Sequence, residues 1–519
     1  MRALRELTLL LLLSQPTGAV TAADWQPYGP AAFDQAEKQD KLILLDLVAV
    51  WCHWCHVMES TTYRDAGVLE ALSEHYVAVQ ADHDARPDLA ERYRDYGWPA
   101  TIVLTPDGRE LVKRAGYIAP DEMAGLLRRT ASIDRSEQHK PTRAAQTSAV
   151  SAALSPALRD ALQQRHLDAD DPASGGLRLM QKFLDADSIE WDLHLAANGD
   201  ADAAQRARRH LDAALQLIDA EFGGAYQYST HGDWAHPHYE KIMATQAAYL
   251  RAYSLAYHQF GDPRYRLAAE MVANWLNDFM RADNGGLFTS QDADLEQGSK
   301  AHDYFELPRD QRLARGLPRI DKSQYADANG KAIEGLVTLY QVTGQDKHLR
   351  LATRALEWVL RNRRRADGGF SHGADDKAGP YLSDNLYMGR AMLAVYEVSG
   401  QSVWLKQAVL AADIIDREFR HAPGGLLSAA DNGTPIKPTP QLDQNIHAAR
   451  FMYALASHTG EDRQRALADH VMRYLATPEV AVSRLTDAGI LLADRDRIRN
   501  SKSNYSLTLI PRNKKGDQA

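Results

Sequence analysis

The periodicity of apolar and polar positions changes along the chain, and the change divides the chain into two regions. Up to about residue 130, short apolar runs of strand length alternate with stretches of helical period. The runs cover residues 42–50, 76–80 and 98–104, and the helical stretches cover 57–60, 66–75, 87–96 and 121–130. From about residue 155 onward, successive segments are helix-periodic. The pattern predicts an α/β domain followed by an all-α domain.

A repeat organises the second region. A single glycine is followed 24 residues later by a Gly-Gly pair at four places, which begin at Gly199, Gly261, Gly344 and Gly400. Each unit is therefore a helix, a glycine turn, a second helix and a Gly-Gly loop. A degraded copy at residues 443–476 and a helix near 155–165 bring the count close to six hairpins. Six hairpins predict an (α/α)6 toroid, and an open solenoid is the structural alternative.

Both cysteines of the 519-residue chain lie in one motif, Cys52-His53-Trp54-Cys55, directly after the first apolar run. A Cys-x-x-Cys pair at a strand-to-helix junction is typical of a thiol–disulfide active site, because the helix N-terminus favours the thiolate of the first cysteine. A bridge closing so short a loop stabilises the fold by only about 1–2 kcal/mol. We therefore expect exchange chemistry at an exposed Cys52, with Cys55 resolving the mixed disulfide and with His53 and Trp54 setting the redox poise.

Two other interpretations of the cysteine motif remain open. With His56, the sequence also matches the pattern of covalent haem attachment. A zinc site would need histidines to complete its ligand shell, because a second cysteine pair is missing. The preceding strand and the Trp98-Pro99 pair have no role in haem attachment, so we expect no cofactor.

Carboxylates and amides gather where the loops after the Gly-Gly pairs enter the next helix. In a toroid they would surround one mouth of the central cavity, where they could bind a glycan or act as general acid and base on a glycoside. Helix N-capping is the alternative role of each Asp or Asn, whereas Glu240 is expected inside a helix. The candidate substrate-binding residues are His238, Glu240, Asp292, Asp294, Asp327, Asp384, Asn385 and Asp443.

The ends and the charge complete the expected organisation. Residues 1–23 have the basic start, the apolar run and the small residues near Ala22 and Ala23 of a secretory signal, with an uncleaved anchor or a buried helix as the alternative. We expect a periplasmic or secreted protein with no membrane span in the mature chain. The net charge of −9 argues against nucleic-acid binding. The expected parts are an α/β domain at 24–135, a linker at 136–154, the toroid at 155–478 and a C-terminal segment at 479–519 that packs on the body.

The order of elements in the first domain resembles the thioredoxin fold. This resemblance implies that Asp46, six residues before Cys52, is the buried carboxylate that relays a proton for the second cysteine. It also implies that Pro99 is the cis-proline that faces the disulfide.

Four motifs together resemble the spermatogenesis-associated protein 20 family: residues 52–59, 97–99 with 104–107, 238–243 and 290–294. The resemblance implies a thioredoxin-like domain followed by a six-hairpin glycosidase-like (α/α)6 toroid. Three hypotheses follow. The first is an exported thiol–disulfide oxidoreductase whose toroid binds a protein thiol or disulfide partner or a glycan. The others are a carbohydrate-active toroid with an accessory redox domain, and a binding scaffold whose redox site is vestigial.

Overall fold

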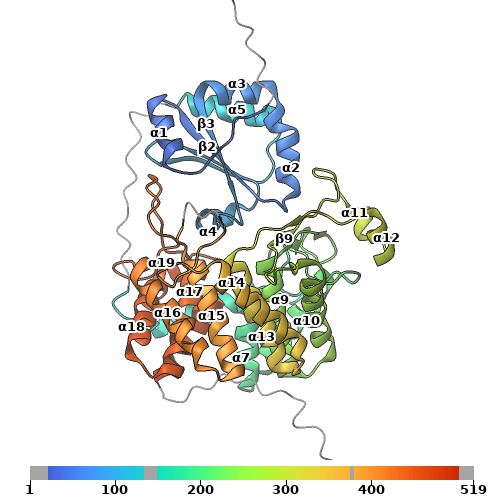
Figure 1. The fold of residues 1–519 in the computed structure, drawn as a ribbon, viewed down its shortest axis with the longest axis vertical. Helices are drawn as coiled ribbons and strands as arrows, with labels where there is room; N and C mark the ends of the chain where they lie inside the picture. Colours follow the sequence, from blue (N-terminus) through green and yellow to red (C-terminus); the bar gives the residue numbers. More distant parts are fainter. Residues whose placement is uncertain (1–21, 134–148, 375–378, 502–519) are drawn as a thin grey trace, which may run out of the picture.

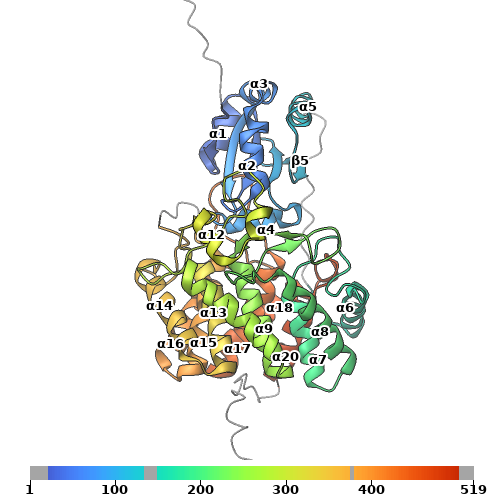
Figure 2. The same cartoon turned by 90° about the vertical axis from the view of Figure 1, so that its right-hand side faces the viewer.

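The structure is a computed structural model that describes residues 22–133, 149–374 and 379–501. It contains two domains stacked along the longest axis, with a sheet domain above a ring of helices (Figures 1 and 2). Nearly all of the expected signal segment, most of the expected linker and the end of the C-terminal segment lie outside the described residues. In the described part of the chain, no helix has both the length and the apolar character of a membrane span.

The first domain is built on a five-stranded sheet in the order β1-β3-β2-β4-β5. The strands are β1 (Gln26–Pro27), β2 (Leu42–Val48), β3 (Tyr76–Asp82), β4 (Ala100–Leu104) and β5 (Glu110–Ala115). β3 runs parallel to β1 and β2, whereas β4 is antiparallel to β2 and β5. The central strand β2 is apolar on both faces, as expected for a strand covered by helices on both sides.

Alternate residues of β2 enter two separate hydrophobic cores. Ile43, Leu45 and Leu47 pack with α1 (Pro30–Lys38) and α4 (Pro87–Tyr93), and the intervening leucines pack with the helices on the other face. The helices of the other face are α2 (His53–Ser60), α3 (Ala66–His75) and α5 (Pro120–Ala131). This arrangement confirms the predicted thioredoxin-like fold.

In the second domain, the described residues form a closed ring of twelve helices in two layers. Each inner helix contacts its two inner neighbours in the ring, in the order α7, α9, α13, α15, α17 and α20, and α20 returns to α7. The inner helices are α7 (Ala186–Ala197), α9 (Met243–Phe260), α13 (Ala326–Thr343), α15 (Leu382–Ser399), α17 (Leu442–Thr459) and α20 (Ala488–Ser501). The outer helices are α6 (Pro156–Ala169), α8 (Ala201–Ala214), α10 (Pro263–Trp275), α14 (Asp346–Asn362), α16 (Ser402–Phe419) and α18 (Asp462–Leu475). The closed ring confirms the (α/α)6 toroid over the open solenoid.

The glycines of the repeat and the C-terminal boundary of the toroid compare differently with the prediction. Four inner helices end on the glycines of the repeat in the left-handed conformation, with φ of 69° at Gly261, 68° at Gly344, 66° at Gly400 and 70° at Gly460. The predicted toroid boundary at residue 478 is wrong, however. α20 is the sixth inner helix and pairs with α6, so the C-terminal segment that was predicted to pack on the body belongs to the ring and closes it.

Short strands and helices decorate the end of the toroid that faces the sheet domain (Figure 1). β8 (Lys241–Ile242), β9 (Ser290–Gln291) and β10 (Ile320–Asp321) form a small antiparallel sheet in the order β10-β9-β8. β6 (Tyr228–Ser229) pairs with β7 (Pro237–His238). The short helices of this domain are α11 (His302–Phe305), α12 (Arg309–Arg315) and α19 (Pro478–Ala481). The prediction that Glu240 lies inside a helix is wrong. Glu240 lies between β7 and β8, and α9 begins only at Met243.

Candidate active site between the two domains

The two cysteines form a disulfide at the start of α2. Cys52 is the N-cap residue of this helix, and its Sγ accepts a hydrogen bond from the backbone N–H of Cys55 at 3.2 Å. The Trp98–Pro99 peptide bond is cis, as the resemblance to thioredoxin-like proteins predicted. The Trp98 side chain packs on the small apolar cluster that contains both sulfurs, together with Ile242 of the toroid.

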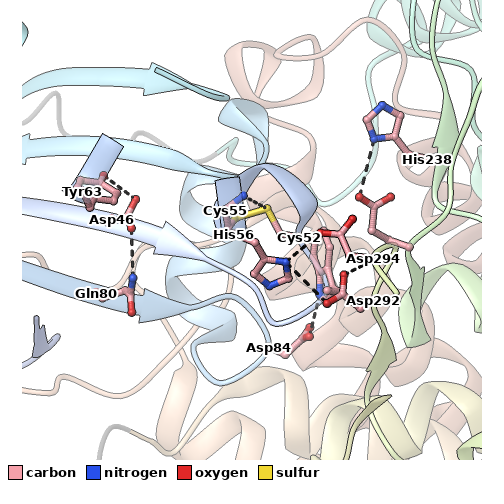
Figure 3. The surroundings of a disulfide bond; sticks show 12 residues. Asp46, Cys52, Cys55, His56, Tyr63, Gln80, Asp84, His238, Asp292 and Asp294 are labelled. Atoms are coloured by element: carbon pink, nitrogen blue, oxygen red, sulfur yellow. Dashed lines mark hydrogen bonds and ion pairs between the residues drawn. A yellow bond between two sulfur atoms is a disulfide. The ribbon is translucent and has the colours of Figure 1, made fainter. Parts of the chain in front are cut away.

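The exposure predicted for Cys52 is wrong. Cys52 and Cys55 are only 3% and 5% exposed, because Ile242 from β8 and the loop after β9 lie against the motif. The thioredoxin-like face that carries the disulfide is therefore covered by the toroid (Figure 3).

Asp46 has the properties that the resemblance assigned to it. Its carboxylate is buried in β2 and accepts hydrogen bonds from the Tyr63 hydroxyl at 3.1 Å and the Gln80 amide at 3.3 Å. Burial raises the pKa of Asp46 to about 7, although both hydrogen bonds act in the opposite direction. A carboxyl group with this pKa can accept or release a proton near neutral pH.

Both histidines of the cysteine motif contact one carboxylate of the toroid. His53 Nδ1 lies 2.7 Å from one oxygen of Asp294, and His56 Nδ1 lies 3.3 Å from the other (Figure 3). Asp292 follows at 3.8 Å from His56 Nδ1. The structure therefore unites two motifs, residues 52–59 and 290–294, that are more than 230 positions apart in the sequence.

The charges of this cluster perturb each other. Burial alone would lower the pKa of His56, but its hydrogen bond to the Asp294 carboxylate and the charge of Asp292 raise it overall. Burial alone would raise the pKa of Asp294, but its contacts with His53 and His56 lower it overall. For Asp292, burial dominates and raises the pKa to about 7, with Glu240 among the nearby charges that add to the effect.

Two carboxylate oxygens of the cluster lack a hydrogen-bond donor among the described residues. Asp292 is 1% exposed and Glu240 is 4% exposed. Neither Asp292 Oδ2 nor Glu240 Oε2 accepts a hydrogen bond from the described residues. Glu240 Oε1 lies 3.8 Å from Nδ1 of the half-buried His238, whose ring stacks on Tyr228. A buried carboxylate oxygen without a hydrogen-bond donor is unfavourable by about 1–3 kcal/mol. A bound group that contacts these two oxygens would remove this cost.

Trp54 lies between the two cysteines in the sequence, and its side chain is partly exposed. The indole contacts the Tyr117 ring at 5.4 Å and the ammonium group of Lys300 at 5.4 Å. Lys300 lies in the toroid between β9 and α11, so Trp54 is at the boundary of the two domains.

Asp327 and Asp384 form a second cluster at the same end of the toroid. His372 Nδ1 lies 2.9 Å from Asp384 Oδ1, while His372 Nε2 lies 2.7 Å from the backbone carbonyl of Asp84 in the sheet domain. Burial alone would lower the pKa of His372, but the carboxylate of Asp384 raises it to about 9. Asp327 pairs with the ammonium group of Lys331 at 2.9 Å. This cluster fastens the two domains together.

The remaining predicted residues have structural contacts. Asn385 is buried and forms an amide clamp: its Oδ1 accepts from the N–H of Phe370, and its Nδ2 donates to the carbonyl of Tyr381. These hydrogen bonds give Asn385 a structural role, and its role in substrate binding stays a prediction. Asp443 makes ion pairs with Arg94 of the sheet domain and with Arg484.

The mouth of the toroid predicted to bind a glycan is covered by the sheet domain. The central axis below it is crossed by ion pairs between inner helices, including Arg251 with Glu190 at 3.0 Å and Arg390 with Glu334 at 2.7 Å. A recess opens at the opposite half of the same helices, and none of the eight predicted substrate-binding residues lines it. Of the predicted residues, Asp292 and Asp294 therefore contact the histidines of the cysteine motif, and Asp327, Asp384, Asn385 and Asp443 have other partners.

Sequence reasoning missed Asp84. Its Oδ2 accepts a hydrogen bond from the indole N–H of Trp51 at 2.9 Å, and its Oδ1 lies 2.8 Å from His83 Nδ1. The signal was present, because residues 83–84 directly follow the carboxyl end of β3, and β3 is parallel to the strand that leads into the cysteine motif.

Comparisons with known proteins agree with this architecture. A family model described as "Protein of unknown function, DUF255" (Thioredox_DsbH) matches residues 13–155. A model described as "Beta-L-arabinofuranosidase, GH127 catalytic domain" matches residues 203–482. Human spermatogenesis-associated protein 20 is 22% identical over 563 aligned residues, which cover 82% of this chain and 72% of the human protein.

Other similarities are limited to one domain. The thiol:disulfide interchange protein DsbD of a Pseudomonas species is 39% identical over 97 residues, 18% of this chain and 16% of the relative. A crystal structure of D-mannose isomerase superimposes with a TM-score of 0.51 at 13% identity, covering 66% of this chain and 98% of that one. A cellobiose 2-epimerase from Spirochaeta thermophila gives 0.50 at 14% identity, covering 67% and 97%. At these identities the two structures show the toroid fold alone.

Proposed function

The chain belongs to the spermatogenesis-associated protein 20 family and, over residues 203–482, to the GH127 catalytic-domain family, and from this premise we propose that it is a thiol–disulfide oxidoreductase. The observation that carries the proposal is the Cys52–Cys55 disulfide at a helix N-terminus, in a domain that also contains the cis peptide bond before Pro99 and the buried Asp46. The similarity of this domain to a protein named for thiol:disulfide interchange supports it.

The exchange follows from these parts. In the reducing direction, the Cys52 thiolate attacks one sulfur of a partner disulfide, forms a mixed disulfide and expels the first partner thiolate. Cys55 then attacks the Cys52 sulfur, expels the second partner thiolate and closes the Cys52–Cys55 bond. Two electrons pass from the pair to the partner, and the carboxylate of Asp46 accepts the proton that Cys55 loses. The oxidising direction reverses every step.

The toroid selects the partner in this proposal. Because Ile242 and the loop after β9 cover the sulfurs, a partner must displace them before it reaches Cys52. The cover therefore slows exchange with small thiols and with proteins that do not bind the toroid, and exchange is fastest with partners that bind it. We further propose that residues 1–23 direct the protein out of the cytoplasm, which N-terminal sequencing of the protein from its own host would test.

Cys55→Ser tests the proposal, because it removes the resolving sulfur and leaves Cys52 to hold a partner. We expect covalent complexes in cells that disappear with dithiothreitol, and none with Cys52→Ser. We also expect the wild-type chain to catalyse dithiothreitol-dependent reduction of a protein disulfide such as that of insulin. Absence of both trapped partners and dithiol-dependent turnover would refute the proposal.

A further inference from the structure

We propose that His56, Asp292 and Asp294 form a binding site for a divalent transition metal ion of the zinc or manganese class, shared by the two domains. The proposal is independent of the redox function, because its ligands are an imidazole and carboxylates and not the bridged sulfurs. One ligand comes from α2 and two from the loop after β9 (Figure 3).

The distances between the potential ligand atoms suit one ion. The three atoms lie within 4.8 Å of one another, with His56 Nδ1 at 3.3 Å from Asp294 Oδ2 and at 3.8 Å from Asp292 Oδ2. Two ligands at about 2.0–2.1 Å from a tetrahedral ion lie about 3.3–3.4 Å apart. The longer of these two separations from His56 Nδ1 closes with a movement of about 0.4–0.5 Å.

The surrounding hydrogen bonds orient both carboxylates and leave Asp292 Oδ2 available to bind a metal ion. The backbone N–H of Asp294 donates to Asp292 Oδ1 at 3.0 Å, while Asp292 Oδ2 accepts nothing from the described residues. The backbone N–H of Gly298 donates to Asp294 Oδ2 at 2.8 Å, and His53 holds the other oxygen of Asp294 at 2.7 Å. Such outer contacts are the usual supports of metal ligands.

The charge balance also favours a cation. Among the described residues, no Lys or Arg makes an ion pair with Asp292, Asp294 or Glu240, so three buried carboxylates face only imidazoles. The cluster of Asp327 with His372 is different, because the ammonium group of Lys331 already supplies its cation. An imidazole combined with carboxylates suits zinc, manganese or iron better than magnesium or calcium.

The experiment measures Zn²⁺ binding by calorimetry to the full, disulfide-bonded chain after removal of metal with a chelator, with Mg²⁺ as the comparison ion. We expect one Zn²⁺ per chain, binding weakened about a hundredfold or more in Asp292→Asn and in His56→Ala, and no comparable binding of Mg²⁺. The matched control is Asp487→Asn, which removes another buried carboxylate whose Oδ2 also lacks a donor among the described residues. The control should bind as the wild type does.

Two further measurements keep the outcome decisive. The Cys52→Ser, Cys55→Ser double variant should bind Zn²⁺ as tightly as the wild type, so loss of redox activity and loss of metal binding are separable. X-ray absorption of the Zn²⁺-loaded wild type should show imidazole and oxygen ligands without sulfur, even where a variant fails to fold. Equal binding by Asp292→Asn and the wild type, equal loss in Asp487→Asn, preference for Mg²⁺, or sulfur ligation would each overturn the proposal.

Discussion

Replacing the buried carboxyl group of Asp46 by an amide should make stability less dependent on pH. In the folded protein burial raises the pKa of Asp46 from 3.8 to about 7, so the folded state holds this proton at pH values where the unfolded chain has lost it. Stability contributed by such a group is present at low pH and is lost as pH rises between the two values. The ionised form is therefore the unfavourable one in the fold.

The magnitude follows from the two pKa values. The wild-type protein should lose about 2–3 kcal/mol between pH 5 and pH 8 through this group alone. Asp46→Asn removes that part of the pH dependence. It also places an amide N–H against the Gln80 amide, which adds a pH-independent loss of about 1–3 kcal/mol.

The assay is urea unfolding of the oxidised full chain at pH 5 and pH 8, followed by tryptophan fluorescence. The difference in unfolding free energy between variant and wild type should move in favour of the variant by about 2–3 kcal/mol from pH 5 to pH 8. Asp34→Asn, which removes an exposed carboxylate from α1, should show a change below about 0.5 kcal/mol. A variant that keeps the wild-type pH dependence would refute the burial argument and remove the basis for a proton relay at Asp46.

Three further predictions concern the toroid and its cover. Asn385→Ala breaks the amide clamp in a buried site and should lower the unfolding free energy by about 2–4 kcal/mol in urea unfolding, so a loss below about 0.5 kcal/mol would contradict a structural role. Ile242→Ala should speed iodoacetamide alkylation of reduced Cys52 several-fold by mass spectrometry, and an unchanged rate would show that Ile242 does not limit access. Arg94 and Asp443 are both partly exposed, so a double-mutant cycle should give a coupling energy below about 1 kcal/mol that decreases with added salt. A coupling energy above about 2 kcal/mol would contradict the argument that this ion pair contributes little.

Local pattern predicted the fold because each element depends on nearby residues. The apolar run 42–50 became β2, and the helix expected at residues 66–75 is α3 with the same bounds. The glycine spacing revealed the repeat, since positive φ at helix ends is a local requirement. The last inner helix escaped prediction because α20 carries no copy of the glycine motif before it.

The site could not be assembled from sequence, because its geometry depends on how the domains dock. Nothing in residues 290–294 indicates that Asp294 contacts His53, since the acidic loop and the cysteine motif belong to different domains. The same docking explains the wrong exposure of Cys52. Glu240 was misplaced for a local reason: β8 pairs with β9, so residues 241–242 are extended and delay the start of α9.

The arrangement of the four family motifs indicates why the two domains belong to one chain. The sheet domain alone would present an ordinary exposed exchange pair, and the toroid alone would leave Asp292, Asp294 and Glu240 at an open mouth, hydrated and without histidine partners. Joined, they bury the disulfide and bring the histidines of α2 against the acidic loop. Burial strengthens each charge interaction in the cluster, because water no longer screens it. Under the proposed function, a partner or ion that binds there contacts both domains, and His53 and His56 would couple recognition by the toroid to reaction at Cys52.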